Sequence, residues 1–223
     1  MHTQLAVLGG GPGGYSAAFL AADLGIQVTL VEAEKQLGGT CLLKGCIPSK
    51  ALLHLARVIA EVDELREDWG VEYGTPRIAI ERIRARKEEV INRLSGGLKH
   101  LAKSRKVKVI NARGVFENST TLRLNVGDRS ISKDNLLTFD NVILATGSQP
   151  VMPPAFDIGS ELVIDSNGAL ELADIPETML VIGGGYIGLE MGTVYAQLGT
   201  QVSVVELLDG LLIGADRDLV KPL

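Results

Sequence analysis

The chain carries one glycine-rich pattern twice, and the two copies lie 174 residues apart. Residues 5–32 contain an apolar strand, a glycine turn, a helix of small residues, and a β-branched strand that ends in an acid. Residues 180–206 repeat this order. A lone GxGxxG is a weak signal, but here each copy follows a strand, opens a helix and meets a carboxylate at the same distance. The shift superposes Gly9, Gly11, Gly14 and Glu32 on Gly183, Gly185, Gly188 and Glu206.

This repeated context predicts two dinucleotide-binding units of α/β class with Rossmann-like topology. The first glycine allows a tight turn, the second admits a pyrophosphate close to the backbone, and the third lets helix pack on strand. The helix N-terminus then favours the anion, and the acid accepts hydrogen bonds from ribose hydroxyls. The Glu206 carboxylate can accept a hydrogen bond from a 2′-hydroxyl but repels a 2′-phosphate. The following "LLDG" contains no arginine that could bind such a phosphate. The second copy therefore favours NAD over NADP. Glycine turns without a ligand are the alternative.

Composition places the chain among soluble globular proteins. It has 223 residues, of which 46% are hydrophobic and 22% charged, and its net charge of −5 argues against a nucleic-acid surface. No stretch offers the roughly 20 apolar residues that a membrane span needs. Leu5 to Leu8 run into glycines without a basic leader, so we expect a first strand and not a signal peptide. With two cysteines only, the cytoplasm is the expected compartment.

The region between the repeats has patterns of its own. Two amphipathic stretches predict helices with one solvated face, and apolar runs between turn residues predict strands. A proline-containing run at 150–154 resembles a linker. The histidines are scattered along the chain and lack the spacing of metal ligands, so we assign them no catalytic or metal-binding role. The predicted helices cover residues 52–62 and 80–101, and the predicted strands cover 107–118, 120–126, 130–133 and 142–145.

Cys41 and Cys46, five positions apart, are the only cysteines. A zinc site needs about four ligands, and no second pair accompanies them. A straight helix would hold the two Cα atoms about 8.6 Å apart, whereas a disulfide needs ~4.4–6.8 Å. If the thiols bond, the segment cannot be a straight helix, and Gly45 and Pro48 are residues that allow a distortion. So short a bridge would stabilise little, and two small buried cysteines remain the alternative.

Four motifs together resemble the pyridine nucleotide–disulfide oxidoreductases. They are "GGGPGGYSAAFLAADLG", "GGTCLLKGCIPSKALL", "VILATGS" and "VIGGGYIGLEMG", and the likeness extends over essentially the whole chain. It is strongest to the members that oxidise dihydrolipoamide. The resemblance implies FAD in the first dinucleotide site and NAD in the second, linked by a redox-active disulfide. It also implies the reaction of dihydrolipoamide with NAD⁺ to give lipoamide and NADH, with a lipoylated carrier protein as partner.

The resemblance also assigns roles to residues. Cys46 is expected to face the flavin, and Cys41 to exchange with the substrate dithiol. Lys50 matches a lysine near flavin N5, and Glu190 matches its ion-pair partner. The expected FAD contacts further include Gly9, Gly11, Gly14, Glu32, Gly39, Thr40, Gly114, Ala145, Thr146, Gly147 and Ser148. The expected NAD contacts are Gly183, Gly185, Tyr186, Ile187, Gly188, Glu190 and Glu206.

The expected domains are an FAD-binding domain with the disulfide at 1–150 and the first part of an NAD-binding domain at 151–223. In the family a C-terminal interface domain follows and supplies a His–Glu dyad across a homodimer. No histidine here follows residue 100, so this stretch alone is expected to be inactive. Leu43, Lys44 and Tyr186 depart from the usual lipoamide-type pattern. A mercuric or glutathione-type reductase, or a non-catalytic flavin-binding module that docks a lipoylated partner, are the alternatives.

Overall fold

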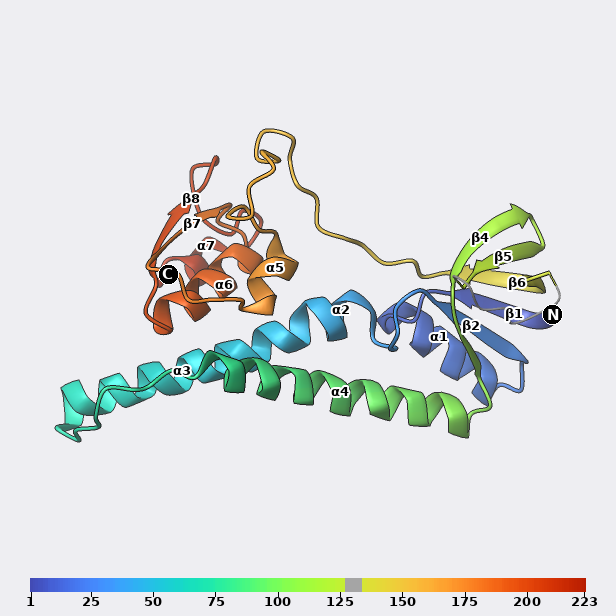
Figure 1. Ribbon diagram of the computed structural model, residues 1–223, viewed down its shortest axis with the longest axis horizontal. Coiled ribbons are helices and arrows are strands. Elements are labelled where there is room, and N and C mark those ends of the chain that lie inside the picture. The colour runs from blue at the N-terminus through green and yellow to red at the C-terminus, as the bar shows by residue number, and fades with distance from the viewer. Residues whose placement is uncertain (127–133) are drawn as a thin grey trace. The chain divides into compact units, whose positions relative to one another are not determined.

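The computed structural model describes residues 1–126 and 134–223. The chain forms two compact units, Met1–Cys46 with Ile91–Gln149 and Ile47–Val90 with Pro150–Leu223. Its elements, in chain order, are β1 (His2–Leu8), α1 (Pro12–Asp23), β2 (Val28–Glu32), α2 (Gly39–Lys44), α3 (Cys46–Trp69), α4 (Ile80–Ser104), β3 (Lys108–Asn111), β4 (Arg113–Asn118), β5 (Thr121–Asn125), β6 (Leu136–Leu144), α5 (Ser166–Glu171), β7 (Thr178–Ile182), α6 (Tyr186–Gln197), β8 (Gln201–Val205) and α7 (Arg217–Val220) (Figure 1).

The first unit is built on a sheet with the strand order β3-β2-β1-β6-β5-β4. Strands β3, β2, β1 and β6 run parallel, and β4 and β5 continue the sheet in antiparallel fashion beyond β6. Helix α1 joins β1 to β2 as the crossover that a parallel pair requires. Figure 1 shows α1 beside these strands. The α/β fold with a parallel sheet that the sequence predicts is thereby confirmed.

Strands β1 and β2, in the centre of the parallel part of the sheet, consist mostly of apolar residues because both of their faces are covered. All five residues of β2 are buried, as expected of a parallel strand. Successive side chains point to opposite faces. Leu5 and Val7 of β1 pack with Ala18 and Ala21 of α1 on one face, whereas Ala6 contributes to a separate core on the other.

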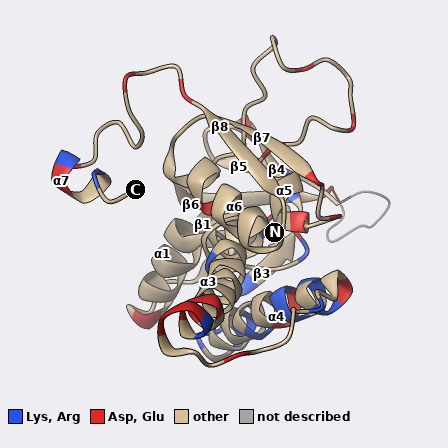
Figure 2. Cartoon of the chain, turned by 90° about the vertical axis from the view of Figure 1, so that its left-hand side faces the viewer, with Lys and Arg blue, Asp and Glu red and all other residues tan. Residues whose placement is uncertain are grey.

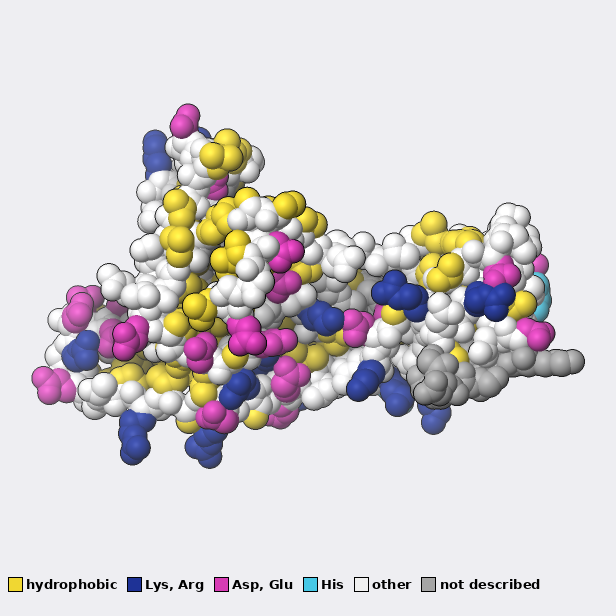
Figure 3. All heavy atoms as spheres, turned by 45° about the horizontal axis from the view of Figure 1, so that its top comes forward, with side chains coloured by type: hydrophobic (Ala, Val, Ile, Leu, Met, Phe, Trp, Pro, Cys, Tyr) yellow, Lys and Arg dark blue, Asp and Glu magenta, His cyan; other side chains and the backbone are white. Residues whose placement is uncertain are grey.

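The second unit contains a smaller parallel sheet, β7–β8, covered on one face by α6. Its core joins Ala169 and Leu170 of α5 to the N-terminal half of α3 and to Tyr195 of α6. The Tyr195 hydroxyl donates to the Ala169 carbonyl at 3.0 Å, and burial, with a smaller effect of Asp174, raises the pKa of Tyr195 to about 12. Leu180 and Ile182 on the uncovered face are 61% and 56% exposed. Figure 3 shows that apolar side chains reach the surface on one face of the molecule.

Helices α3 and α4 contain both predicted helices. Helix α3 extends its predicted range at both ends, and α4 extends its own at the C-terminal end. Arginines of α4 pair with glutamates of their own helix: Arg84 with Glu81 at 3.1 Å and Arg86 with Glu89 at 2.6 Å. Figure 2 shows the charges of both signs along α4. This agrees with the solvated face that the sequence predicts. None of the helices in residues 1–126 and 134–223 has the length and apolarity of a bilayer-spanning segment.

Some predicted boundaries differ from the structure. Strand β6 is longer than the expected 142–145, because its first residues pair with both β1 and β5. The expected strand at 130–133 lies outside the described residues. The chain passes between the two compact units at 46/47, 90/91 and 149/150. Assignment of residues 1–150 and 151–223 to FAD and NAD stays a prediction.

Candidate dinucleotide and redox sites

The first glycine turn leads from β1 into α1 and leaves no room for side chains at Gly9, Gly10 and Gly14. Gly9 has φ +108°, and a Cβ there would collide with the carbonyl oxygen of Ala145. A Cβ on Gly14 would collide with the Gly9 carbonyl oxygen. Helix α1 begins after Gly11 with Pro12, so its N-terminus carries no side-chain cap. This bare turn before a helix N-terminus suits the approach of a pyrophosphate.

Glu32, at the end of β2, is buried and held by two backbone N–H groups. Gly10 N–H donates to Oε2 at 2.5 Å, and Glu34 N–H donates to Oε1 at 2.7 Å. The carboxylate therefore lies against the glycine turn. Each carboxylate oxygen has more than one lone pair, so both keep acceptor capacity for a ribose hydroxyl.

The other residues expected around FAD gather at the same edge of the sheet. Gly39 has φ +60°, and a Cβ there would approach Gly11 Cα to 2.5 Å. The Thr40 hydroxyl donates to the Ser148 carbonyl at 3.0 Å. The segment 145–148 follows the carboxyl end of β6, beside that of β1. Gly114 on β4 lies against Leu8, the last residue of β1. Ligands bind in α/β sheets at such an edge.

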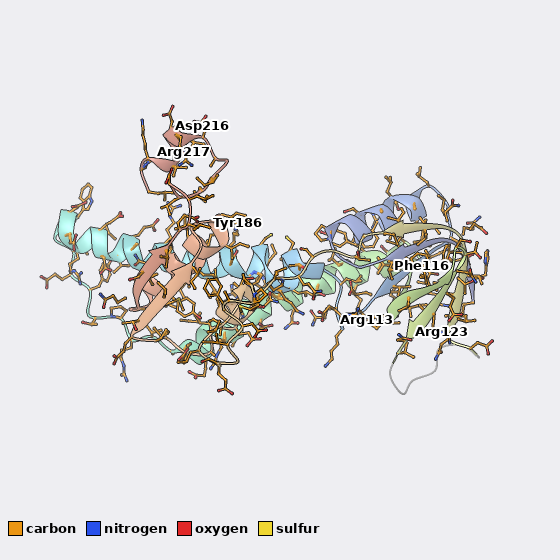
Figure 4. The ribbon with its side chains drawn as sticks, turned by 90° about the horizontal axis from the view of Figure 1, so that it is seen from above. Arg113, Phe116, Arg123, Tyr186, Asp216 and Arg217 are labelled. Atoms are coloured by element: carbon orange, nitrogen blue, oxygen red, sulfur yellow. The ribbon has the colours of Figure 1, made fainter. Side chains whose placement is uncertain are left out.

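The second glycine turn repeats this geometry between β7 and α6. Gly183 has φ +110°, and a Cβ on Gly188 would collide with the Gly183 carbonyl. Helix α6 begins after Gly185, and the first side chain on it, Tyr186, is 67% exposed (Figure 4). Ile187 is also exposed. A bare turn before a helix N-terminus again suits a pyrophosphate.

The acid of the second copy is held in the same way as the first. Gly184 N–H donates to Oε2 of Glu206 at 2.6 Å, and Leu208 N–H donates to Oε1 at 2.9 Å. These backbone donors, Leu208 before Gly184, lower the pKa of Glu206 below its ordinary value of 4.5. The carboxylate that would meet a ribose is therefore ionised at neutral pH.

Cys41 and Cys46 lie on either side of a helix break. Helix α2 ends at Lys44, and α3 begins at Cys46. Gly45 separates them, and a Cβ on it would meet the Thr40 carbonyl oxygen at 3.0 Å. The segment is therefore not one straight helix, as a bond between the two cysteines would require. Cys41 is half-buried and Cys46 is exposed.

Ion pairs flank the cysteines. Lys50 lies one turn after Cys46 on α3, a spacing that puts both side chains on one helix face. Its Nζ lies 2.5 Å from Glu190 Oε1 of α6. On α2, Lys44 Nζ lies 2.6 Å from Glu34 Oε1. Sequence reasoning did not identify Glu34, although its place two residues after Glu32 was a usable signal.

Among the described residues, no group of three or more His, Cys, Asp or Glu side chains is arranged to hold a metal ion. Most residues expected at the first site gather around the first glycine turn, but Lys50, expected near the flavin, lies in the second unit, where it pairs with Glu190. The first turn belongs to the first unit and the second turn to the second unit. The segment from Leu211 to Arg217, which lies over the second turn, was absent from the sequence-based prediction.

Comparison with known proteins agrees with this geometry. The profile of the pyridine nucleotide-disulphide oxidoreductase family matches residues 3–222. The chain is 48% identical to a dihydrolipoyl dehydrogenase of Vibrio cholerae over 99% of its own length and 46% of that protein's. It is 42% identical to one of Halobacterium salinarum, with 99% of this chain and 46% of the relative covered.

A solved structure gives the same result. The HOCl-induced flavoprotein disulfide reductase RclA from Escherichia coli, in its Cu(II) complex, superposes with a TM-score of 0.81 at 30% identity. The superposition covers 99% of this chain and 46% of that structure. The chain thus spans about half the length of the relatives it matches. On the family profile, the relatives and the shared fold, the chain belongs to the pyridine nucleotide-disulphide oxidoreductase family.

Proposed function

We propose that this chain is the cofactor-binding and cysteine-bearing part of a dihydrolipoyl dehydrogenase. The reaction is the oxidation of dihydrolipoamide to lipoamide with reduction of NAD⁺ to NADH. The observation that carries the proposal is the cysteine pair, Cys41 and Cys46, which lies on either side of the helix break at Gly45 and follows the first βαβ unit in the chain. Relatives at 48% identity bear this enzyme's name.

The proposal assigns FAD to the first turn and NAD to the second. The first cradle, formed by Gly9, Gly14, Gly39 and Glu32, is closed to side chains, as a firmly held pyrophosphate requires. In the second, Glu206 is ionised, which disfavours a 2′-phosphate and supports NAD. FAD, when bound, would accept two electrons from the cysteine pair and deliver them to NAD⁺ as a hydride.

The cysteines perform the exchange with substrate. In the oxidised enzyme Cys41 and Cys46 form a disulfide. A thiolate of dihydrolipoamide attacks Cys41 Sγ, which breaks that bond and releases Cys46 as a thiolate. The second substrate thiol gives up its proton, attacks the mixed disulfide and displaces Cys41. The products are the cyclic disulfide of lipoamide and a reduced cysteine pair, so two electrons enter the protein.

The Lys50 ammonium stabilises negative charge near Cys46, since both residues share one face of α3. Glu190 fixes that ammonium, with Nζ and Oε1 2.5 Å apart. A nearby cation favours the thiolate form that exchange requires. Lys50 is therefore the residue that prepares Cys46 as a leaving group.

The finer assignments follow from the same proposal. The substrate would be the lipoyl group of a carrier protein, the full-length protein a homodimer, and the compartment the cytoplasm. The relatives named dihydrolipoyl dehydrogenase support this. The acid–base group that assists Cys41 would come from outside residues 1–223, because no histidine follows His100.

The proposal is tested on the full-length protein loaded with FAD. Turnover is compared with lipoamide, oxidised glutathione and mercuric ion, and lipoamide is expected to be preferred. Two-electron reduction is expected to give a long-wavelength absorbance band that Cys46→Ser abolishes. Preference for glutathione or mercuric ion, or absence of turnover with all three, would overturn the assignment.

A further inference from the structure

Each copy of the glycine-rich pattern contains an equivalent backbone hydrogen bond, formed by the segment that follows its acid. Gly38 N–H donates to the Gly10 carbonyl at 2.9 Å, and Leu212 N–H donates to the Gly184 carbonyl at 2.9 Å. The two donor residues are 174 positions apart in the sequence, and so are the two acceptor residues. The leucine before each donor also occupies the space that a side chain on the central glycine would need. The segment after β8 is therefore the structural counterpart of the segment after β2.

The counterparts differ in how they close on the turn. In the first copy the donor is a glycine, Gly38, with φ +139°. In the second it is Leu212, with φ +50°, a left-handed conformation that a leucine adopts only at a steric cost. A Cβ on Gly11 would meet Gly39 Cα at 3.5 Å, whereas one on Gly185 would meet nothing within 4 Å. The following segment therefore approaches Gly11 in the first copy but leaves Gly185 open in the second.

Arg217, the first residue of α7, holds the second segment in this conformation. Its Nη2 donates to the carbonyls of Leu211 and Leu212, both at 2.9 Å, and to that of Ala215 at 3.4 Å. Its Nη1 lies against Gly210, where a Cβ would approach it to 3.1 Å. Figure 4 shows Arg217 beside Asp216 at the beginning of α7. One guanidinium group thus donates hydrogen bonds to three carbonyl groups of the segment 211–215.

The direction of these carbonyls fixes that of the neighbouring N–H groups. In a trans peptide the C=O and N–H point in opposite directions. Since the carbonyls of Leu211 and Leu212 point to one nitrogen of Arg217, the N–H groups of Leu212 and Ile213 point away from it. The first reaches Gly184. The second likewise points away from Arg217, and backbone N–H groups attract phosphate oxygens.

We propose that Arg217 is a positioning residue of the second dinucleotide site. It keeps residues 211–215 against Gly184 and, through their backbone, sets the affinity for NAD without touching the nucleotide. The inference rests on the proposed function, because it takes NAD as the ligand of this site. It explains how Leu212 is held in a left-handed conformation, where the first copy has a glycine with a different positive φ.

The experiment compares Arg217→Met with the unmodified full-length holoenzyme. NADH binding is followed by fluorescence titration, and flavin content by visible absorbance. The Kd for NADH is expected to rise about two- to tenfold, the range for lost hydrogen bonds of this kind, with flavin content unchanged. Arg217→Lys is expected to lie in between. Lys221→Met is the matched control, because the ion pair that Lys221 forms among residues 1–126 and 134–223 is with Asp218 of α7, with Nζ 3.8 Å from Oδ1.

A second variant separates positioning from loss of structure. Leu212→Gly in the Arg217→Met background is expected to restore part of the NADH affinity, because glycine adopts the left-handed conformation without cost. Unchanged NADH binding by Arg217→Met, or no recovery in the double variant, would overturn the role of Arg217. Failure of the unmodified holoenzyme to bind NADH would instead overturn the proposed function.

Discussion

Lys50 Nζ lies 2.5 Å from Glu190 Oε1, which joins the second turns of α3 and α6 within the second unit. The carboxylate is the more enclosed partner, with its side chain 24% exposed against 58% for the lysine. A pair this exposed adds little stability. Its consequence is positional, because the glutamate fixes where the ammonium stands relative to Cys46.

Glu190→Gln should therefore change reactivity more than stability. We expect less than about 1 kcal/mol of destabilisation, but roughly tenfold slower reduction of the cysteine pair by dihydrolipoamide, because a neutral amide holds the ammonium less well. Denaturant titration and stopped-flow absorbance measure the two. Glu61→Gln, which removes the Arg57 partner on α3 at 2.7 Å, is the control. Equal rates in both variants would contradict the prediction.

Gly39→Ala should impair the first site. Its φ of +60° and the close approach to Gly11 leave no place for a methyl group. A non-glycine residue there costs about 1–2 kcal/mol in backbone energy alone, so we expect a purified protein with substantially less FAD. The visible absorbance per protein measures this. Gly74→Ala, where a Cβ would meet nothing within 4 Å, should keep its flavin.

Glu206 predicts a specific dependence of stability on pH. Its pKa is lowered in the folded state, so its contribution to stability is fully present above the ordinary value of 4.5 and is lost as the pH falls through the lower, folded value. Glu206→Gln lacks this contribution at every pH. The stability difference between the two proteins should be constant at neutral pH and should shrink below about pH 4.5. Urea titrations across that range test it, and a difference that widens in acid would refute it.

The pair of Lys44 and Glu34 predicts two substitutions with opposite effects. Lys44 follows Cys41 by three positions on α2, so its ammonium favours the Cys41 thiolate, and Glu34 at 2.6 Å partly neutralises it. Lys44→Met should lower the alkylation rate of Cys41 in the reduced protein about twofold, and Glu34→Gln should raise it by a similar factor. Mass spectrometry of timed iodoacetamide reactions measures both. A shift of both rates in one direction would indicate a structural effect only.

The sequence predicts much of this arrangement because glycine and charge patterns are local. The turns at Gly9 and Gly183, the helices that follow them and the acids at Glu32 and Glu206 all depend on residues within one βαβ unit. The break at Gly45 was likewise readable, because glycine there is followed closely by proline. Such features need no knowledge of distant contacts.

Other features could not be predicted because they depend on distant partners. The division of the chain at 46/47 and 90/91 results from packing of Leu52 and Ala56 against α5 and α6, which no local pattern records. The hydrogen bond from Leu212 to Gly184 could not be predicted by analogy with the first copy, because the equivalent position there is a glycine, Gly38. The register of β6 depends on two neighbouring strands at once.

The pairing of β1 with β6 also determines when the first unit can fold. Ala6 lies opposite Val142 in the centre of that sheet. Strand β1, which is synthesised first, therefore cannot pair with β6 until more than 130 further residues have been synthesised. At about 5–20 residues per second on the ribosome, that delay is on the order of ten seconds. Pairings so distant in sequence form slowly. During synthesis, therefore, β1 has an unpaired edge for long enough that a chaperone or a neighbouring nascent chain could bind it.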